Sequence, residues 1–355
     1  MGAASMGEFG KVPSPSGLSV TSYANRTATL SWKSYGYDKN ILRWDSESGS
    51  SNQIDLPGVE GPASHVLSDI NPGTTYSFMV KTGKSQGIAS IPPWIYSDWD
   101  SIRWVGGLYI LLYRASTGQA FVRQIQGDPN ALSIGAPYVI GGWETDWTQV
   151  IPFQFSQQHY LAYYSDNGRA FGAALIAGDN GPRNGDSYPI SVWESGYAQI
   201  ASFTYEGRPY FLYYKHNGQA FVSSIVAGGK GPLNGNGYVI GGGEGDWTQV
   251  TPFNFGSRTY LLLYRGRDGL AYVAPMVDGQ YGPQNGDGAV IGGWETDWAH
   301  ISSLEIDGRS SLLLVRANGD VFLAPIVDGP KGPQNGQPVP IGNIGTGWTV
   351  VRCLG

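Results

Sequence analysis

The stretch Gly141-Gly-Trp-Glu-Thr-Asp-Trp147 decides the fold, because variants of it recur about every fifty residues, each ending on an aromatic anchor. The chain between two anchors keeps one order: a tyrosine-rich apolar run such as Tyr160-Leu-Ala-Tyr-Tyr164, a glycine turn, and a second apolar run such as Arg169-Ala-Phe-Gly172. A Gly-Pro-x-Asn-Gly loop usually follows. Runs of this length and composition are typical of β-strands. The anchors are Trp99, Trp147, Tyr197, Trp247, Trp298 and Trp348.

A unit of four short strands cannot bury its apolar face alone, whereas five units arranged radially share a core. The sequence therefore predicts an all-β fold with a five-bladed β-propeller over residues 96–355. The anchor strand occurs once more than the other elements, so one copy must close the ring. The pattern favours Trp348-Thr-Val-Val351, completing a blade whose other strands come from residues 105–140, over the alternative in which the Trp99 segment does so.

Composition narrows the class of partner. Glycine is 53 of 355 residues and charged residues are 14%, which predicts many tight turns and few solvated helices. The net charge of −6 comes without a basic cluster, which argues against nucleic acid and anionic lipid as partners. The apolar stretches are too short for membrane insertion, which needs about eighteen residues.

Metal, cofactor and targeting signals are weak. Cys353 is the single cysteine, which excludes an intramolecular disulfide and a cysteine-rich metal site. The four histidines fall at unrelated positions of the repeat, so we expect no metal site, and no sequence motif calls for a cofactor. The first ten residues have no signal-peptide pattern, which leaves both an extracellular and a cytosolic location open.

Residues 12–85 lack the repeat and read as alternating short strands, which predicts a small β-sandwich followed by a linker over residues 86–95. Trp32 and the segment Asn71-Pro-Gly-Thr-Thr-Tyr76 resemble the core tryptophan and the tyrosine-corner turn of fibronectin type III domains. The resemblance implies a fibronectin type III-like β-sandwich that serves as a spacer or as a homodimer contact, without catalytic residues.

The loop before each anchor is the candidate ligand site. Aromatic rings stack on the C–H face of a sugar and carboxylates accept hydrogen bonds from its hydroxyls, so their combination in a short loop is typical of carbohydrate binding. Three loops carry an extra tryptophan, and the last copy, Gly342-Asn-Ile-Gly-Thr-Gly347, has lost both acids. The candidate residues in these loops are Trp143, Glu144, Asp146, Trp193, Glu194, Glu244, Asp246, Trp294, Glu295 and Asp297.

A basic or polar residue follows each tyrosine run: Arg114, Ser165, Lys215, Arg265 and Arg316. In an alternating strand this position points away from the neighbouring tyrosine. Two interpretations remain open: these residues line a ligand groove opposite the acidic loop, or they form salt bridges with the loop acids. We include the four basic residues among the candidate ligand-binding residues.

Catalysis is the weaker interpretation. A glycosidase needs two or three carboxylates at unique positions, whereas the prominent acids of this chain recur at equivalent positions of the repeats. We therefore expect no catalytic residue. The alternatives are a protein-binding propeller scaffold and a glycosidase.

The Trp-anchored unit with its Gly-Gly-Trp-Glu-x-Asp-Trp loop resembles the repeats of tectonin and tachylectin-type propeller lectins over about residues 95–355. The resemblance implies carbohydrate as the partner, with several equivalent weak sites for a simple sugar such as an N-acetylated hexosamine. Because two copies lack part of the loop pattern, we expect three or four competent sites that act multivalently.

Overall fold

The computed structural model describes twelve stretches of the chain, and within them every regular element is a β-strand. No helix long and apolar enough to cross a membrane occurs in these stretches. The chain divides into two compact units, Met1–Gly106 and Gly107–Gly355. The described residues are 15–24, 27–46, 50–68, 75–85, 94–96, 100–105, 108–126, 131–156, 158–178, 181–242, 245–306 and 309–354.

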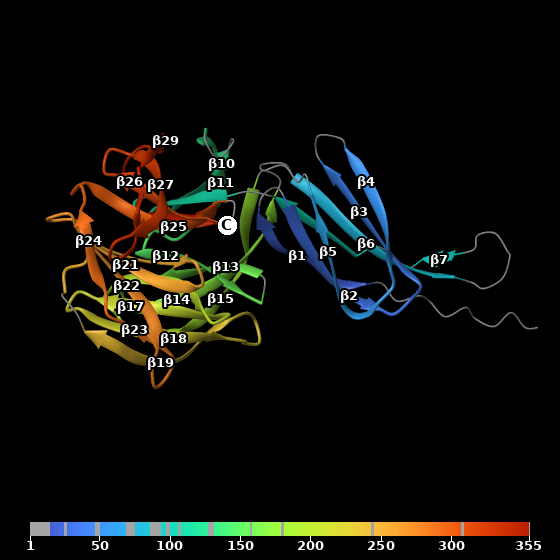
Figure 1. Cartoon of the computed structure of the whole chain (residues 1–355), viewed down its shortest axis with the longest axis horizontal. Helices are drawn as coiled ribbons and strands as arrows, with labels where there is room; N and C mark the ends of the chain where they lie inside the picture. The colour runs from blue at the N-terminus through green and yellow to red at the C-terminus, as the bar shows by residue number, and fades with distance from the viewer. Residues whose placement is uncertain are drawn as a thin grey trace, which may run out of the picture. The chain divides into compact units, whose positions relative to one another are not determined.

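The first unit consists of two antiparallel sheets (Figure 1). One sheet has the order β1-β2-β5, formed by Ser16–Ala24, Thr27–Tyr35 and Glu60–Leu67. The other runs β4-β3-β6, and both β7 and β8 pair with β6; its strands are β3 (Lys39–Ser46), β4 (Ser51–Pro57), β6 (Thr75–Ser85), β7 (Trp94–Tyr96) and β8 (Asp100–Val105). Alternate residues of β2 are buried, as expected for a strand with one face on a core.

The core of this unit contains Trp32 and Tyr76, the two residues on which the resemblance to fibronectin type III domains depends. Trp32 and Tyr76 are 4% exposed and lie in one apolar cluster with Leu30 and Phe78.

The boundary between the units differs from the expected one. β7 and β8 fall in the expected linker and at the expected start of the propeller, yet they pair with β6. The Trp99 anchor lies outside the described residues.

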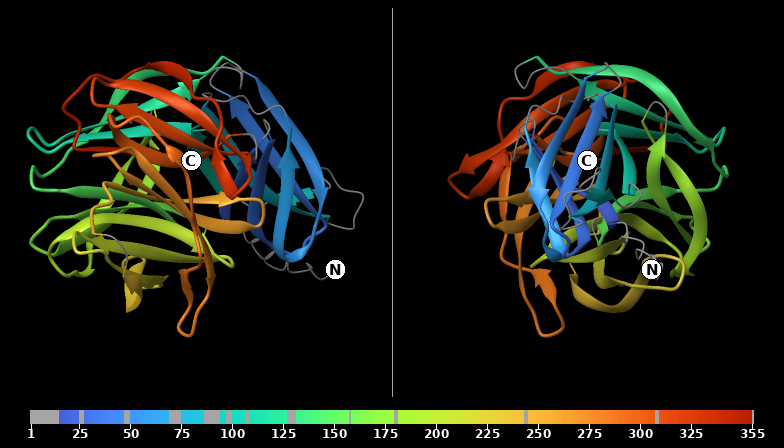
Figure 2. Two further views of the ribbon diagram at one scale, coloured as in Figure 1. Left: turned by 60° about the vertical axis from the view of Figure 1, so that its left-hand side comes forward. Right: turned by 90° about the vertical axis from the view of Figure 1, so that its right-hand side faces the viewer.

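The second unit contains five antiparallel sheets, numbered here in chain order (Figures 1 and 2). Sheet 1 comprises β9 (Leu108–Arg114), β10 (Gln119–Gln126), β11 (Ser133–Gly142) and β30 (Val350–Leu354). Sheet 2 comprises β12 (Gln149–Phe155), β13 (Gln158–Tyr164), β14 (Arg169–Gly178) and β15 (Gly181–Val192). Sheet 3 comprises β16 (Tyr197–Tyr205), β17 (Arg208–Lys215), β18 (Gln219–Val226) and β19 (Leu233–Gly242).

The last two sheets each have a split outer strand. Sheet 4 comprises β20 (Gln249–Phe255), β21 (Arg258–Arg265), β22 (Leu270–Asp278), β23 (Pro283–Asn285) and β24 (Ala289–Gly293). Sheet 5 comprises β25 (Trp298–Ile306), β26 (Arg309–Arg316), β27 (Asp320–Gly329), β28 (Gly332–Asn335) and β29 (Val339–Asn343). The arrangement is all-β and propeller-like.

One strand from each sheet lines the middle of the unit. The inner strands β12, β16, β20, β25 and β30 contact one another in that order, and β30 contacts β12, so the contacts form a closed ring. β30 pairs with β9, placing Val350 opposite Tyr113. This is the closure that the sequence favoured, with the C-terminal strand completing the sheet formed by residues 108–142.

The tyrosine runs form the second strand of each sheet and are buried on both faces. In β9, Tyr109 to Tyr113 are all at most 4% exposed. A strand buried on both faces reads as a continuous apolar run because neighbouring layers cover both sides. Packing between consecutive sheets therefore explains why these runs show no alternation of apolar and polar residues.

Candidate functional site

In four of the five sheets, the loop that follows the outer strand is hydrogen-bonded to a hairpin turn of the same sheet. The backbone N–H of Trp143 donates to the carbonyl of Gly118 at 2.7 Å, and that of Trp193 donates to Gly168 at 2.9 Å. A Cβ atom on Gly118 would lie 2.2 Å from the Trp143 carbonyl oxygen, and φ is +68° there. Both the close approach and the left-handed backbone require glycine at this turn.

Buried tyrosines at the ends of the tyrosine runs hold the acidic part of the loop. Their hydroxyls donate to backbone carbonyls, at 2.5 Å from Tyr113 to Glu144, 3.0 Å from Tyr164 to Glu194 and 2.7 Å from Tyr264 to Glu295. Burial raises the pKa of these phenols, so they remain protonated donors at neutral pH. This role was not predicted, although the repetition of tyrosine at the fifth position of the run was a signal for it.

Each of the five anchors within the described residues carries a cation over its aromatic ring. We call the anchor, its cation and the loop acids bound to that cation a station, named after the anchor. Cations favour the electron-rich face of an aromatic ring within about 6 Å. The distances to the ring centroids are 4.8 Å for Arg169 over Trp147, 5.7 Å for Lys215 over Tyr197, 5.5 Å for Arg265 over Trp247, 5.1 Å for Arg316 over Trp298 and 4.4 Å for Arg114 over Trp348.

The Trp147 station shows how one sheet replaces a missing cation. Ser165 occupies the repeat position of the basic residue and bonds to Asp146 at 3.3 Å. Arg169, at the start of β14, supplies the guanidinium and pairs with Glu144 at 2.7 Å and with Asp146 at 2.5 Å. The hydrogen bond that Arg169 donates to Glu144 raises the pKa of Arg169. Arg169 was absent from the predicted residues, and its signal was a basic residue where the other sheets carry Gln, Leu or Asp.

The Tyr197 and Trp298 stations use the predicted cations. Lys215 binds Glu194 at 2.6 Å. Arg316 forms an ion pair with Glu295, and its Nε lies 3.6 Å from Asp297. The sequence left two roles open for the basic residues, lining a ligand groove or forming salt bridges with the loop acids. At these two stations the basic residues do form salt bridges with the loop acids.

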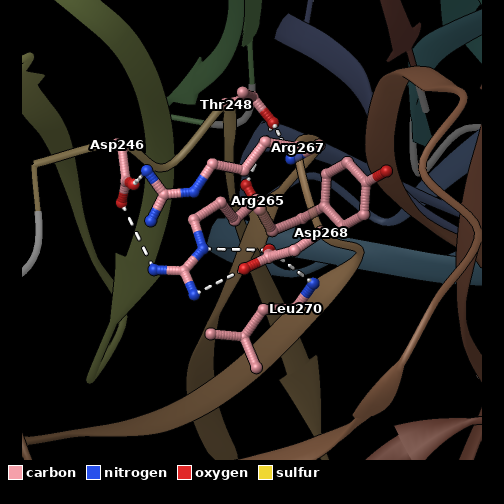
Figure 3. Close-up of polar contacts among 8 residues, drawn as sticks. Asp246, Thr248, Arg265, Arg267, Asp268 and Leu270 are labelled. Carbon is pink, nitrogen blue, oxygen red and sulfur yellow. Dashed lines mark hydrogen bonds and ion pairs between the residues drawn. The ribbon is translucent and has the colours of Figure 1, made fainter.

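The Trp247 station holds two arginines (Figure 3). Arg267 pairs with Asp246 at 2.5 Å, and Arg265 lies 3.5 Å from the same carboxylate. Arg265 also binds Asp268 at 2.8 Å, which lowers the pKa of that carboxyl. The predicted residue Glu244 lies outside the described residues.

The Trp348 station has no acid, as its loop sequence indicates. The guanidinium of Arg114 donates to the carbonyls of Thr346 at 2.9 Å and Gly347 at 3.3 Å. The cation and its aromatic partner are therefore kept although the carboxylates are lost.

The carboxylates of the acid-bearing stations face solvent. The side chains of Glu144, Glu194 and Glu295 are 60%, 65% and 58% exposed, although each binds a cation. Oxygen atoms that are both positioned and exposed are available to accept hydrogen bonds from a ligand. No group of three potential metal ligands occurs among the described residues.

The extra loop tryptophans pack between sheets, which corrects part of the predicted site. Trp193 is 5% exposed and lies against Tyr164 of β13 and against Phe211 and Tyr213 of β17. Its ring faces are covered by protein, so it has no surface on which a sugar can stack.

The other two loop tryptophans are half-buried. Trp143 contacts Tyr113 and Tyr163, with ring centroids 5.4 and 4.9 Å apart. Trp294 contacts Tyr264 at 5.9 Å. These rings keep part of their surface in solvent, and stacking on a ligand remains a prediction for them alone.

No protein-family profile and no curated protein matches the chain. Among solved structures, it is similar to an α-L-arabinofuranosidase from Clostridium thermocellum, at 12% identity and a TM-score of 0.44, covering 74% of this chain and 90% of that one. It is also similar to the Aleuria aurantia lectin in complex with Fucα1-6GlcNAc, at 14% identity and a TM-score of 0.36, covering 76% and 93%. The SapL1 lectin in complex with alpha methyl fucoside matches at 13% identity and a TM-score of 0.37, covering 67% and 83%. These structures thus comprise an arabinofuranosidase and two lectins.

Proposed function

We propose that the second unit is a five-bladed β-propeller lectin that binds carbohydrate at its acid-bearing stations. The observation that carries this proposal is the repeated, exposed pair of a carboxylate and a cation fixed over an aromatic ring, as at Glu295 and Arg316 over Trp298. We assign one sugar site to each of the four acid-bearing stations, and the number of sites that bind sugar stays a prediction.

The chemistry of a station suits neighbouring hydroxyls of a sugar. Each hydroxyl both donates and accepts a hydrogen bond. A carboxylate accepts from one hydroxyl while a guanidinium donates to the next, so a fixed acid–cation pair matches two adjacent hydroxyls better than either group alone. At the Trp147 and Trp298 stations, the half-buried loop tryptophans Trp143 and Trp294 supply apolar surface for the C–H groups.

Several shallow sites on one rigid ring suit a surface that displays many copies of one glycan. Linked sites convert later binding events into intramolecular ones, which raises avidity without new contacts. We therefore propose weak binding of a single sugar and strong binding of a glycan-coated surface, with an N-acetylated hexosamine as the first sugar to test.

A glycan array on the full chain, followed by calorimetry with the best monosaccharide, tests the proposal. We expect up to four sugars per chain for the wild type and one fewer for Arg316→Gln. Arg114→Gln is the matched control, because its station has no acid and should leave the stoichiometry unchanged. An array without hits on folded protein would overturn the lectin proposal, and equal losses in both variants would overturn the assignment to the acid-bearing stations.

Binding rather than catalysis is also part of the proposal. The loop carboxylates bind cations at repeated stations, whereas glycoside hydrolysis requires one acid with a raised pKa beside a second carboxylate. Turnover of a chromogenic glycoside would contradict it. The second candidate, a protein-binding scaffold, predicts one partner per chain, which calorimetric stoichiometry separates from several sugars.

For the first unit we propose a fibronectin type III-like sandwich. Its eight described strands form two antiparallel sheets, β1-β2-β5 and β4-β3-β6 with both β7 and β8 paired to β6, and Trp32 of β2 lies in the core. We propose that it acts as a spacer or a homodimer contact. Sedimentation of the full chain tests the second role, which predicts a concentration-dependent dimer.

A further inference from the structure

The inner strands of the second unit surround a cavity of about 250 Å³. One repeat position contributes a residue from each of the five strands to its lining: Ile151, Ala201, Thr251, Ser302 and Arg352. Four of these side chains are short or apolar, and the fifth is an arginine. At this repeat position the inner strand β30 therefore differs from the other four, and it brings a single positively charged side chain to the cavity.

Arg352 has no carboxylate partner within the described part of the chain. Its Nη1 donates to the carbonyl of the adjacent Val351 at 3.1 Å, and it forms no ion pair with any described residue. The described residues that line the cavity include neither Asp nor Glu. Glu305 lines an adjoining cavity of about 170 Å³ but is exposed and does not pair with Arg352.

Burial lowers the pKa of Arg352 to about 10, which leaves the guanidinium protonated at neutral pH. A half-buried charge without a counter-charge is costly, because it gives up hydration without gaining an ion pair. A counter-ion from solution would remove this cost.

The other polar groups of the cavity favour an anion as well. Ser302 adds a hydroxyl, and Gln154 adds an amide. His159 also lines the cavity, and its imidazole carries an N–H that can donate to an anion. A volume of about 250 Å³ equals roughly eight waters at 30 Å³ each, which is enough for one small anion and several waters.

We propose that this cavity is a binding site for one small oxyanion, a carboxylate, phosphate or sulfate, held by the guanidinium of Arg352. Planar guanidinium groups bind such anions through two parallel hydrogen bonds. The site is single and central, whereas the stations are repeated at the loops before the anchors. It does not depend on the proposed sugar binding.

The test is calorimetry and thermal unfolding of the full chain with sodium acetate, phosphate and sulfate, each against sodium chloride at the same ionic strength. We expect one anion per chain and a higher melting temperature with at least one of the three, and the anion that binds identifies the source. Arg352→Met should weaken binding at least tenfold. Arg114→Gln, which alters an arginine outside the cavity, should bind as the wild type does.

Ser302→Asp provides a second, independent variant. The Ser302 hydroxyl accepts a hydrogen bond from the Cys353 N–H at 3.1 Å, and a carboxylate can keep this bond while supplying an internal counter-charge to Arg352. We expect this variant to fold and to lose its response to the anion. Absence of any anion-specific stabilisation of the wild type would overturn the proposal, as would unchanged binding in Arg352→Met or, should that variant not fold, in Ser302→Asp.

Discussion

Replacement of His300 by glutamine should remove much of the acid sensitivity of the second unit. His300 stands on β25 at the repeat position that Gln149, Gln199 and Gln249 occupy in the other inner strands. Each of these glutamines donates from Nε2 to a carbonyl near the start of the next sheet, at 3.0, 3.1 and 2.9 Å respectively. Burial, aided by the charge of Arg352, lowers the pKa of His300 from 6.5 to about 4.

The sign and size of the effect follow from this shift. Because the folded-state pKa is depressed, the unfolded chain binds the proton more tightly, and stability is lost as the pH falls from about 6.5 to about 4. At 1.36 kcal/mol per pKa unit, a shift of about 2.5 units corresponds to about 3 kcal/mol, of which about 2 kcal/mol falls between pH 7 and pH 4.5.

Urea unfolding of the wild type and of His300→Gln at pH 7 and at pH 4.5 measures the difference. The variant should lose about 2 kcal/mol less than the wild type between these pH values, because glutamine does not titrate. His216→Gln, which alters an exposed turn, is the control and should behave as the wild type. Equal acid losses in His300→Gln and the wild type would refute the reasoning.

Three further predictions follow from packing. Trp193→Ala should lower the free energy of unfolding by about 3–5 kcal/mol, because Trp193 is buried between two sheets; an unchanged urea midpoint with a lost sugar site would contradict its packing role. Gly269→Ala should lower the melting temperature more than Gly207→Ala. Both glycines have positive φ, but a Cβ atom at position 269 would lie 1.9 Å from the Trp294 carbonyl oxygen, whereas one at position 207 would meet no atom within 4 Å. Equal losses in the two variants would refute a steric clash at position 269. The Cys353 thiol, whose pKa burial raises to about 12, should react with a disulfide reagent at pH 8 only after unfolding; rapid labelling of native protein would contradict this.

The sequence predicted the strands and the closing strand correctly because both depend on patterns internal to the chain. The tyrosine runs became the buried second strands, and β30 joined β9. The boundary between the units was harder to place, because β8 lies beside the Trp99 segment, which resembles a repeat anchor, although β8 pairs with β6. Only long-range pairing separates such a strand from the repeat.

The candidate site was predicted in outline. The loop acids and the basic residues do meet, as at Glu194 and Lys215. Trp193 was assigned to ligand stacking because the extra tryptophan is absent from some copies, but its burial depends on Phe211 and Tyr213 of the following sheet. Arg169 was missed because it lies on a different strand from the other cations and reaches the same acids only in three dimensions.

The pairing of β30 with β9 also governs the order in which the ring can fold. Sheet 1 draws its inner strand from residues 350–354 and its other strands from residues 108–142, so its hydrogen bonds span most of the unit. Contacts this distant in sequence are closed late, because the entropy of a large loop must be lost before they form. During synthesis, sheets 2 to 5 can pair locally as they emerge, but β9 must wait for the last strand with its apolar edge uncovered. The nascent chain therefore keeps this strand edge unpaired until its last residues have been synthesised.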